Sequence, residues 1–387
     1  MIDKVQIKDC CLCGNCVEYC PANAIELKKE FEIFKYPQIN LDKCIHCELC
    51  ENLCPSIQNL AQQSHVSSYI AKNKNLNVKK QSSSGGIFSV FAEVIIDNGG
   101  VVCGATFDNN LKVKHIIVDN KKDLQKLRGS KYVQSDLGDC FLKIKQLLQA
   151  GQMVLFVGCP CQTAALRTYL KKDYPNQLYL VDFICHGMLS QSLFDDYIKY
   201  LEKKYKSRVV SFSFRDKTDG WIESGPKVTF ENGKIKHWPL YEDTYMLGYF
   251  KALCMKSQCY ICKYKNFYSG SDITLADYWG CEILDPEFYD FYGVSSVVIN
   301  NENGNLLFNN VSNNIEYKDV DLENIVKYNS GLIKPFEEGK DRSLFMDKIK
   351  NGSTYIDALL DTADKSNIIL QLYREIKRKI RILKDKY

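Results

Sequence analysis

Glycine, proline and long apolar runs are scarce in this chain of 387 residues. Its 22 Gly and 9 Pro are too few for a collagen-like or low-complexity protein, and 25% charged with 45% hydrophobic residues is typical of globular domains. Long apolar runs are also missing, because residues 87–96 and 153–158 reach at most about half the length that crosses a bilayer. We therefore expect no membrane-spanning segment.

An excess of charge is missing as well. Lys and Arg total 51 and Asp and Glu total 47, which leaves a net charge of +4 that is spread along the chain except at its end. So mild an excess gives little support to nucleic acid binding, and we expect no nucleic acid partner. At roughly 150 residues per domain, the length predicts two or three domains.

Cysteine, in contrast, is abundant, with 18 residues. A disulfide-rich secreted protein would begin with a signal peptide, but charged residues stand at positions 3, 4, 8 and 9 and no apolar segment follows them. We therefore expect reduced thiols and a cytoplasmic protein.

The first 54 residues hold nine of these cysteines in a repeated pattern. The run C-x2-C-x2-C-x3-C-P occurs twice, 34 residues apart, and it is the run of bacterial ferredoxins with two clusters. In that arrangement three close thiolates bind one 4Fe-4S cluster and the fourth binds the other cluster. The predicted ligand sets are Cys10, Cys13, Cys16 and Cys54 for one cluster, and Cys44, Cys47, Cys50 and Cys20 for the second.

Zinc is the alternative for these cysteines, because C-x2-C pairs also occur in zinc sites. Two regular sets of four, each followed by proline, favour the clusters. Cys11 has no place in the pattern and is interpreted as a bystander, and His46 as a surface side chain. Residues 24–42 predict two short strands around a turn. Such a module passes single electrons and performs no substrate chemistry by itself.

The body of the chain predicts alternating strands and helices. Small and hydroxyl residues at 82–86 precede a helical pattern from Ile87, and free backbone N–H groups at a helix start favour a phosphate. Ordinary helix capping is the alternative. The apolar run 153–158 predicts a buried strand of a mainly parallel sheet. Two strands end in cysteines, at Cys159 and Cys185, and ligands collect at such strand ends.

Four thiols of this body could hold a third 4Fe-4S cluster. Two of them follow strands and two stand in one C-x2-C turn: Cys161, Cys185, Cys259 and Cys262. A structural zinc site and plain buried thiols are the alternatives. Cys159 and Cys254 are substitutes within this set.

On its motifs the chain resembles the family of coenzyme F420 hydrogenase/dehydrogenase beta subunits, which are iron-sulfur flavoproteins, with a two-cluster 4Fe-4S ferredoxin-like domain fused at the N-terminus. The resemblance covers roughly residues 66–325. Its motifs, in order, are Ser84-Gly85-Gly86, Gly129-Ser130-Lys131-Tyr132, Gly158-Cys159-Pro160-Cys161-Gln162, Cys185-His186-Gly187, Phe214-Arg215-Asp216-Lys217, Cys259-Tyr260-Ile261-Cys262 and Asp277-Tyr278-Trp279-Gly280. Two departures are Cys159 at a variable position and Ala276 where relatives often have Gly.

The resemblance implies FAD in a mixed α/β domain, beside iron-sulfur clusters that exchange electrons with it. The implied flavin-binding residues are Ser83, Ser84, Gly85 and Gly86 on one wall, Ser130, Lys131 and Tyr132 on the opposite wall, and Asp277 and Trp279. Lys131 would stabilise the reduced ring and His186 would donate a proton. The alternatives are an exposed lysine after a turn and a core histidine bonded to backbone.

These features predict an iron-sulfur flavoprotein oxidoreductase that passes electrons between 4Fe-4S clusters and FAD. Its partners would be ferredoxin or another redox protein and a small-molecule substrate, with an organic substrate reduced or a reduced deazaflavin or nicotinamide oxidised. No G-x-G-x-x-G stands between a strand and a helix, so a Rossmann NAD site is not evident. The alternative is a non-catalytic electron-transfer subunit of a larger redox complex.

The expected architecture has three parts. Residues 1–60 form a small α+β ferredoxin-like domain, residues 61–330 a mixed-sheet α/β flavoprotein domain, and residues 331–387 a helical C-terminal region. Within the last region, residues 367–387 predict a basic amphipathic helix, which is typical of peripheral contact with a membrane or a partner groove. A terminal helix packed on its own domain is the alternative.

Overall fold

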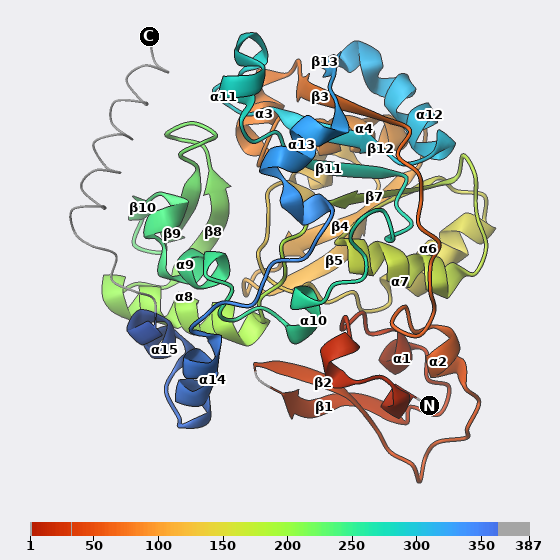
Figure 1. Cartoon of the computed structure of the whole chain (residues 1–387), viewed down its shortest axis with the longest axis vertical. Helices are drawn as coiled ribbons and strands as arrows, with labels where there is room; N and C mark the ends of the chain where they lie inside the picture. Colours follow the sequence, from red (N-terminus) through yellow and green to blue (C-terminus); the bar gives the residue numbers. More distant parts are fainter. Residues whose placement is uncertain (1, 32, 363–387) are drawn as a thin grey trace.

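The computed structural model describes residues 2–31 and 33–362 and places a small N-terminal part against a larger body (Figure 1). In the small part, strands β1 (Ile25–Phe31) and β2 (Phe34–Ile39) pair antiparallel, as residues 24–42 predicted. Each cysteine run leads into a short helix, α1 (Asn15–Glu18) or α2 (Leu49–Asn52). The short 3-10 turns η1 (Ile2–Lys4) and η2 (Ile7–Asp9) precede them.

An eight-stranded sheet forms the centre of the body, in the order β13-β3-β12-β11-β7-β6-β4-β5. The pairs β4 with β6, β6 with β7 and β7 with β11 are parallel, and the outer pairs are antiparallel. The predicted mixed α/β class is therefore confirmed, and parallel pairing is limited to the centre. The strands are β3 (Ser67–Asn73), β4 (Val101–Phe107), β5 (Val113–Val118), β6 (Val154–Val157), β7 (Leu178–Phe183), β11 (Ile273–Asp277), β12 (Ser295–Ile299) and β13 (Ile315–Asp319).

Helices cover both faces of this sheet because its central strands are apolar on both sides. Along β6, Leu155 packs with α4 (Ile87–Asp97) and α12 (Glu302–Val311) in one core. Its neighbour Phe156 packs with α6 (Cys140–Gln149) and α7 (Pro160–Leu170) in another. This alternation follows from the period of two residues along a strand, and a continuous apolar run is what a doubly covered strand requires.

A second sheet, β8-β9-β10, packs beside the central one. It comprises β8 (Val209–Asp216), β9 (Gly225–Phe230) and β10 (Ile235–His237). A turn at Asn232-Gly233 joins the last two strands, and Gly233 has φ +79°, which glycine adopts without steric cost. An aromatic-rich core joins this sheet to α8 (Gln191–Tyr205), α9 (Thr244–Phe250), α14 (Arg342–Lys350) and α15 (Tyr355–Thr362).

Short elements complete the described chain. They are α3 (Leu76–Gln81), α5 (Lys121–Leu124), η3 (Gln125–Leu127), η4 (Leu240–Glu242), α10 (Ser257–Tyr260), α11 (Cys281–Leu284), η5 (Pro286–Phe288), η6 (Ser312–Asn314), α13 (Leu322–Tyr328) and η7 (Ser330–Leu332). The predicted basic helix at 367–387 lies outside the described residues. Within residues 2–31 and 33–362, no helix is both long and apolar enough to cross a membrane.

Candidate functional site

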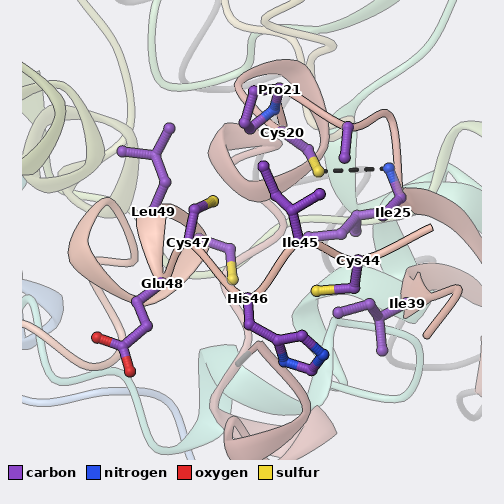
Figure 2. A pocket seen from close by; sticks show the side chains of 13 residues that line it. Cys20, Pro21, Ile25, Ile39, Cys44, Ile45, His46, Cys47, Glu48 and Leu49 are labelled. Carbon is purple, nitrogen blue, oxygen red and sulfur yellow. Dashed lines mark hydrogen bonds between the residues drawn. The ribbon is translucent and has the colours of Figure 1, made fainter. Parts of the chain in front are cut away.

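Four cysteines of the N-terminal repeat surround one small apolar cavity. Cys20, Cys44, Cys47 and Cys50, called here the second thiol set, line it together with isoleucines. Figure 2 shows Cys20, Cys44 and Cys47 around this space, with Ile45 among them. The backbone N–H of Ala24 donates to Cys20 Sγ at 3.3 Å, a bond typical of cluster-ligating thiolates. The four residues are those that the ferredoxin pattern groups together.

The other four repeat cysteines, Cys10, Cys13, Cys16 and Cys54, are called the first thiol set. Burial raises the pKa of Cys10 to about 12, and the neighbouring thiol of Cys11 adds to the rise. Burial also raises the pKa of Cys16, and the thiols of Cys10 and Cys54 contribute. Crowded, buried thiols of this kind ionise only when a cation shares their site, which is how metal binding displaces their protons.

The third thiol set, Cys161, Cys185, Cys259 and Cys262, gathers where the small part meets the body. Cys161 lies in the first turn of α7, Cys185 follows β7, and Cys259 lies in α10. Gly187 allows close packing here, because a Cβ at this residue would lie 2.4 Å from Met255 Sδ and 3.3 Å from the Cβ of Cys259. Cys161 shares a buried cluster with Cys11, against which Cys13 of the first thiol set packs. The third set therefore adjoins the first set.

Cys159 and Cys254 take other positions. Cys254 is fully buried in the aromatic-rich core, against which Cys259 of the third thiol set also packs. Cys159 is the N-cap of α7, and its side chain accepts from the N3 backbone N–H. The thiols of Cys159 and Cys185 form a hydrogen bond, and this bond lowers the pKa of Cys185 to about 6. Cys159 and Cys185 both line a large cleft in the body, whereas Cys161 does not.

A buried lysine stands between the first and third thiol sets. Lys256 has no exposed surface, and its Nζ donates to the carbonyl oxygen of Cys11 and, at 2.9 Å, to Gln134 Oε1. Burial acts to lower the pKa of Lys256, but the sulfur atoms of Cys259 and Cys161 outweigh it and the pKa is raised. Two oxygen acceptors hold its Nζ in place. No sequence motif pointed to this position, because its contacts come from segments far apart in the chain.

A site for a single metal ion needs closer ligands than an iron-sulfur cluster does. Among the residues that the structure describes, no three His, Cys, Asp or Glu side chains are grouped closely enough for one metal ion. A cubane cluster instead bonds each of its four thiolates to a different iron atom.

The cleft in the body has a volume of about 340 Å³, within the usual range for small-molecule sites. It lies at the carboxyl ends of the central parallel strands, where ligands of α/β sheets collect. Of the predicted flavin and catalytic residues, nine line it: Ser83, Ser84, Gly86, Ser130, Lys131, Tyr132, His186, Asp277 and Trp279. Gly85 does not; a Cβ there would lie 2.6 Å from the carbonyl oxygen of Ala71.

The serines before α4 join the walls of this cleft instead of capping the helix. Gly86 is the N-cap of α4, with φ +84° and no side-chain cap. Ser83 Oγ accepts from the backbone N–H of Ser130 at 2.7 Å and from Ser130 Oγ at 2.8 Å. Ser84 Oγ donates to the carbonyl oxygen of Val294 at 2.8 Å. The capping alternative is therefore wrong for these serines, and the first N–H groups of α4 have no side-chain acceptor.

Asp277, in the cleft wall, holds two other side chains in place by hydrogen bonds. Its carboxylate accepts from Arg215 at 3.1 Å and from Trp221 Nε1 at 2.6 Å. Trp221 stacks on Trp279 with ring centroids 4.9 Å apart and the planes nearly parallel. Arg215 also donates to Ser224 Oγ at 2.8 Å and lines the cleft. Arg215 stands in the motif Phe214-Arg215-Asp216-Lys217, but nothing in that motif indicates its role at the cleft.

Lys131 and His186 are both largely buried at the cleft. Lys131 Nζ donates to the carbonyl oxygens of Leu127 at 3.0 Å and Arg128 at 2.9 Å, and burial lowers its pKa to about 7. His186 stacks on Phe336, with centroids 4.5 Å apart, and burial lowers its pKa to about 4. Its surroundings therefore disfavour the charged imidazolium form of His186.

Comparison with known proteins assigns the class. Residues 9–57 match the model of the 4Fe-4S dicluster domain, and residues 151–324 match that of the C terminus of the coenzyme F420 hydrogenase/dehydrogenase beta subunit. By class the chain is an iron-sulfur protein of an oxidoreductase family. Residues 151–324 are similar to the family of coenzyme F420 hydrogenase/dehydrogenase beta subunits, and the predicted resemblance is confirmed.

Two curated relatives and one solved structure are similar. The F subunit of F(420)H(2) dehydrogenase from Methanosarcina mazei is 22% identical over 202 residues, 47% of this chain and 55% of the relative. Coenzyme F420-dependent sulfite reductase of Methanocaldococcus jannaschii is 24% identical over 359 residues, 86% of this chain and 50% of the relative. The chain thus spans about half the length of these relatives. A chain of the F420-reducing NiFe hydrogenase complex of Methanosarcina barkeri aligns with a TM-score of 0.46 and 18% identity, over 78% of this chain and 92% of that chain.

Proposed function

We propose that the chain is an iron-sulfur flavoprotein oxidoreductase that passes electrons between 4Fe-4S clusters and FAD. One observation carries the proposal: Cys185 belongs to the third thiol set and also lines the cleft. A cluster on that set would lie beside any ligand of the cleft. The dicluster domain at residues 9–57 supplies the other two thiol sets.

The residues of the cleft fit a flavin nucleotide. The uncapped start of α4 and the side chain of Arg215 suit an anionic phosphate, and Trp279 offers an aromatic surface. A bound flavin exchanges electrons singly with clusters and in pairs with organic substrates. Lys131 would place a positive charge at one wall, held by the carbonyl oxygens of Leu127 and Arg128.

The thiol sets follow an order from the surface to the cleft. Cys47 of the second set is exposed, and the other 17 cysteines are not. Cys50 of that set and Cys54 of the first set pack around the same buried cluster, and Cys13 of the first set packs near Cys161 of the third. This order supports a redox protein partner, such as ferredoxin, at the second set and a small-molecule substrate at the cleft.

Both curated relatives are named for coenzyme F420, so a reduced deazaflavin is the first candidate substrate. A nicotinamide and an organic electron acceptor are the other classes to compare. Which of these classes reacts would also decide the direction of electron flow.

Anaerobic purification tests the proposal. We expect about twelve irons with matching sulfide and one FAD per chain, and bleaching of the visible spectrum by dithionite. Mixing with reduced deazaflavin, NADH or reduced ferredoxin would then identify the reactants by their effect on the flavin absorbance. About eight irons with flavin would contradict the third cluster. Iron without flavin would contradict the proposal that the chain is a flavin-dependent enzyme.

A non-catalytic electron-transfer subunit is the second candidate. It is favoured by one relative, which is named as a subunit of a dehydrogenase. A flavin that is reduced by a partner protein and by no small molecule would support this candidate.

A further inference from the structure

Lys256 is a buried cation with no carboxylate partner among the described residues, and the buried Lys265 and Lys217 likewise donate to carbonyl oxygens. Some other buried cations do have a carboxylate partner. Lys79 pairs with Asp290, and Arg215 pairs with Asp277. The Nζ of Lys256 bonds only to the carbonyl oxygen of Cys11 and the side-chain oxygen of Gln134. An ammonium ion held by two neutral oxygens loses much of its hydration energy, so a nearby anion is needed to offset the cost.

Cysteines on both sides of Lys256 would supply anionic surroundings once they bind clusters as thiolates. Cys11, whose carbonyl group holds Lys256, lies between Cys10 and Cys13 of the first thiol set. On the other side, the backbone N–H of Cys259 donates to the carbonyl oxygen of Lys256 at 2.8 Å, and Cys161 packs against Cys11. Lys256 therefore lies at the contact between the first and third sets.

We propose that Lys256 is the shared counter-ion of the first and third thiol sets and sets the reduction potentials of the clusters that they hold. This inference rests on the proposed function, since it requires both clusters. A cluster with four thiolate ligands is anionic, and reduction adds one more negative charge without a proton. A fixed positive charge in a poorly polarisable interior stabilises that charge and raises the potential.

The position of Lys256 also affects the coupling of the two sets. Two anionic centres side by side disfavour each other's reduction, and a cation between them weakens this repulsion. Lys256 is thus a positioning charge for single-electron transfer between the sets, where one electron leaves one centre as it enters the other. It has no contact with the cleft.

Lys265 provides a matched comparison. It is also a buried lysine, and its Nζ donates to the carbonyl oxygens of Cys185 and, at 2.6 Å, Gly331. These contacts lie at the third thiol set on the side of the cleft, and none involves the first set. The K265M variant removes the same charge from a comparably buried position, so it controls for the loss of a buried lysine.

The experiment is an anaerobic redox titration of the full chain with dithionite, followed by electron paramagnetic resonance and visible absorbance. In K256M we expect the midpoint potentials of two clusters to become more negative, while the cluster of the second thiol set stays unchanged. In K265M we expect one potential at most to shift. Unchanged potentials in K256M with full iron content would overturn the proposal, and so would an equal shift of all three clusters.

A second variant keeps the test decisive if K256M fails to retain its iron. Q134E keeps Lys256 and places a carboxylate against its Nζ, which neutralises the charge. We expect the same two potentials to become more negative in Q134E, and unchanged potentials would contradict the inference. Absence of clusters from the unaltered protein would instead refute the proposed function, so the two failures are distinguishable.

Discussion

Cys11 differs from the eight cysteines around it, although it is as buried as any of them. It shares a cluster with Cys161 and Tyr264, and its carbonyl group, rather than its sulfur atom, holds Lys256. The ferredoxin pattern leaves it without an iron. Its thiol is therefore expected to be dispensable for cluster binding.

Iron analysis of two alanine variants tests this distinction. C44A removes a member of the second thiol set, and we expect it to lose about four irons per chain, because a cubane needs its thiolates. C11A leaves all three sets complete and should keep its full iron content. An equal loss in both variants would show that the assignment of ligands in the repeat is wrong.

His115 adds a pH dependence to the stability of the fold. It is buried at the cleft, its Nε2 bonds to the carbonyl oxygen of Val157 at 3.2 Å, and its Nδ1 has no partner. Burial lowers the pKa of His115 from 6.5 to about 4. Below pH 6.5 the unfolded chain therefore binds a proton that the folded chain does not, so the free energy of unfolding falls as the pH falls toward 4.

The H115Q variant should reduce this dependence. Near pH 5 the histidine contributes a slope of about 1.3 kcal/mol per pH unit, and glutamine contributes none. Urea unfolding of both proteins between pH 7.5 and 5, without oxygen, measures the difference. Parallel pH profiles would mean that His115 is protonated in the folded protein.

Cysteine spacing leads to a prediction of the thiol sets, whereas the charges around them leave no signal in the sequence. Cysteine spacing is a local property, and the short loops that it defines bring the sulfur atoms together. Arg215 and Lys256 depend on partners elsewhere: Asp277 is 62 positions from Arg215, and Cys11 is 245 positions from Lys256. No pattern within one segment indicates such pairs, so their roles came only from the structure.

At the scale of elements, local periodicity predicted most strands and helices of the body. The run 153–158 became β6, and the pattern after Gly86 became α4. The order of strands was not predictable, because β3 lies between β12 and β13, which follow it by more than 200 residues. Those long-range antiparallel pairs are what turn a parallel centre into a mixed sheet.

Helix α1 anchors the N-terminal part to the body through one buried amide. Asn15 Nδ2 donates to the carbonyl oxygens of Leu53, at 3.0 Å, and Ala165 of α7, at 3.2 Å. N15A would remove both hydrogen bonds, including the one that joins α1 to α7, at a cost of about 1–3 kcal/mol. We expect cleavage in the linker at residues 58–66 to become about tenfold faster, because it follows the population of the undocked state.

Limited proteolysis of the full chain measures this effect. N98A is the control, because Asn98 Nδ2 bonds only to the carbonyl oxygen of Val94 in its own helix. Equal cleavage rates in N15A and N98A would show that Asn15 does not hold the two parts together.

At the scale of the whole molecule, the second thiol set and the cleft lie at opposite ends of the series of thiol sets. The second set is therefore the expected entrance for electrons from a partner protein. Cys47 is exposed, and beside it Ile45 is 64% exposed and Leu41 59% exposed. Exposed apolar side chains around a redox centre are typical of a docking surface for a partner protein. A partner that docks here would exchange electrons at the second thiol set first.

The L41E variant tests this entrance, because Leu41 is exposed and does not line the cavity of the second thiol set. A charge within the contact should slow reduction by a protein donor about tenfold, since an apolar anchor contributes about 1.4 kcal/mol or more. Dithionite needs no docking surface and should reduce both proteins equally fast. I235E is the matched control: Ile235 is 56% exposed but lies in β10, in the second sheet of the body. Equal slowing of L41E and I235E would place the entrance elsewhere, whereas slowing of L41E alone, with ferredoxin as donor in stopped-flow absorbance, would locate it at the second thiol set.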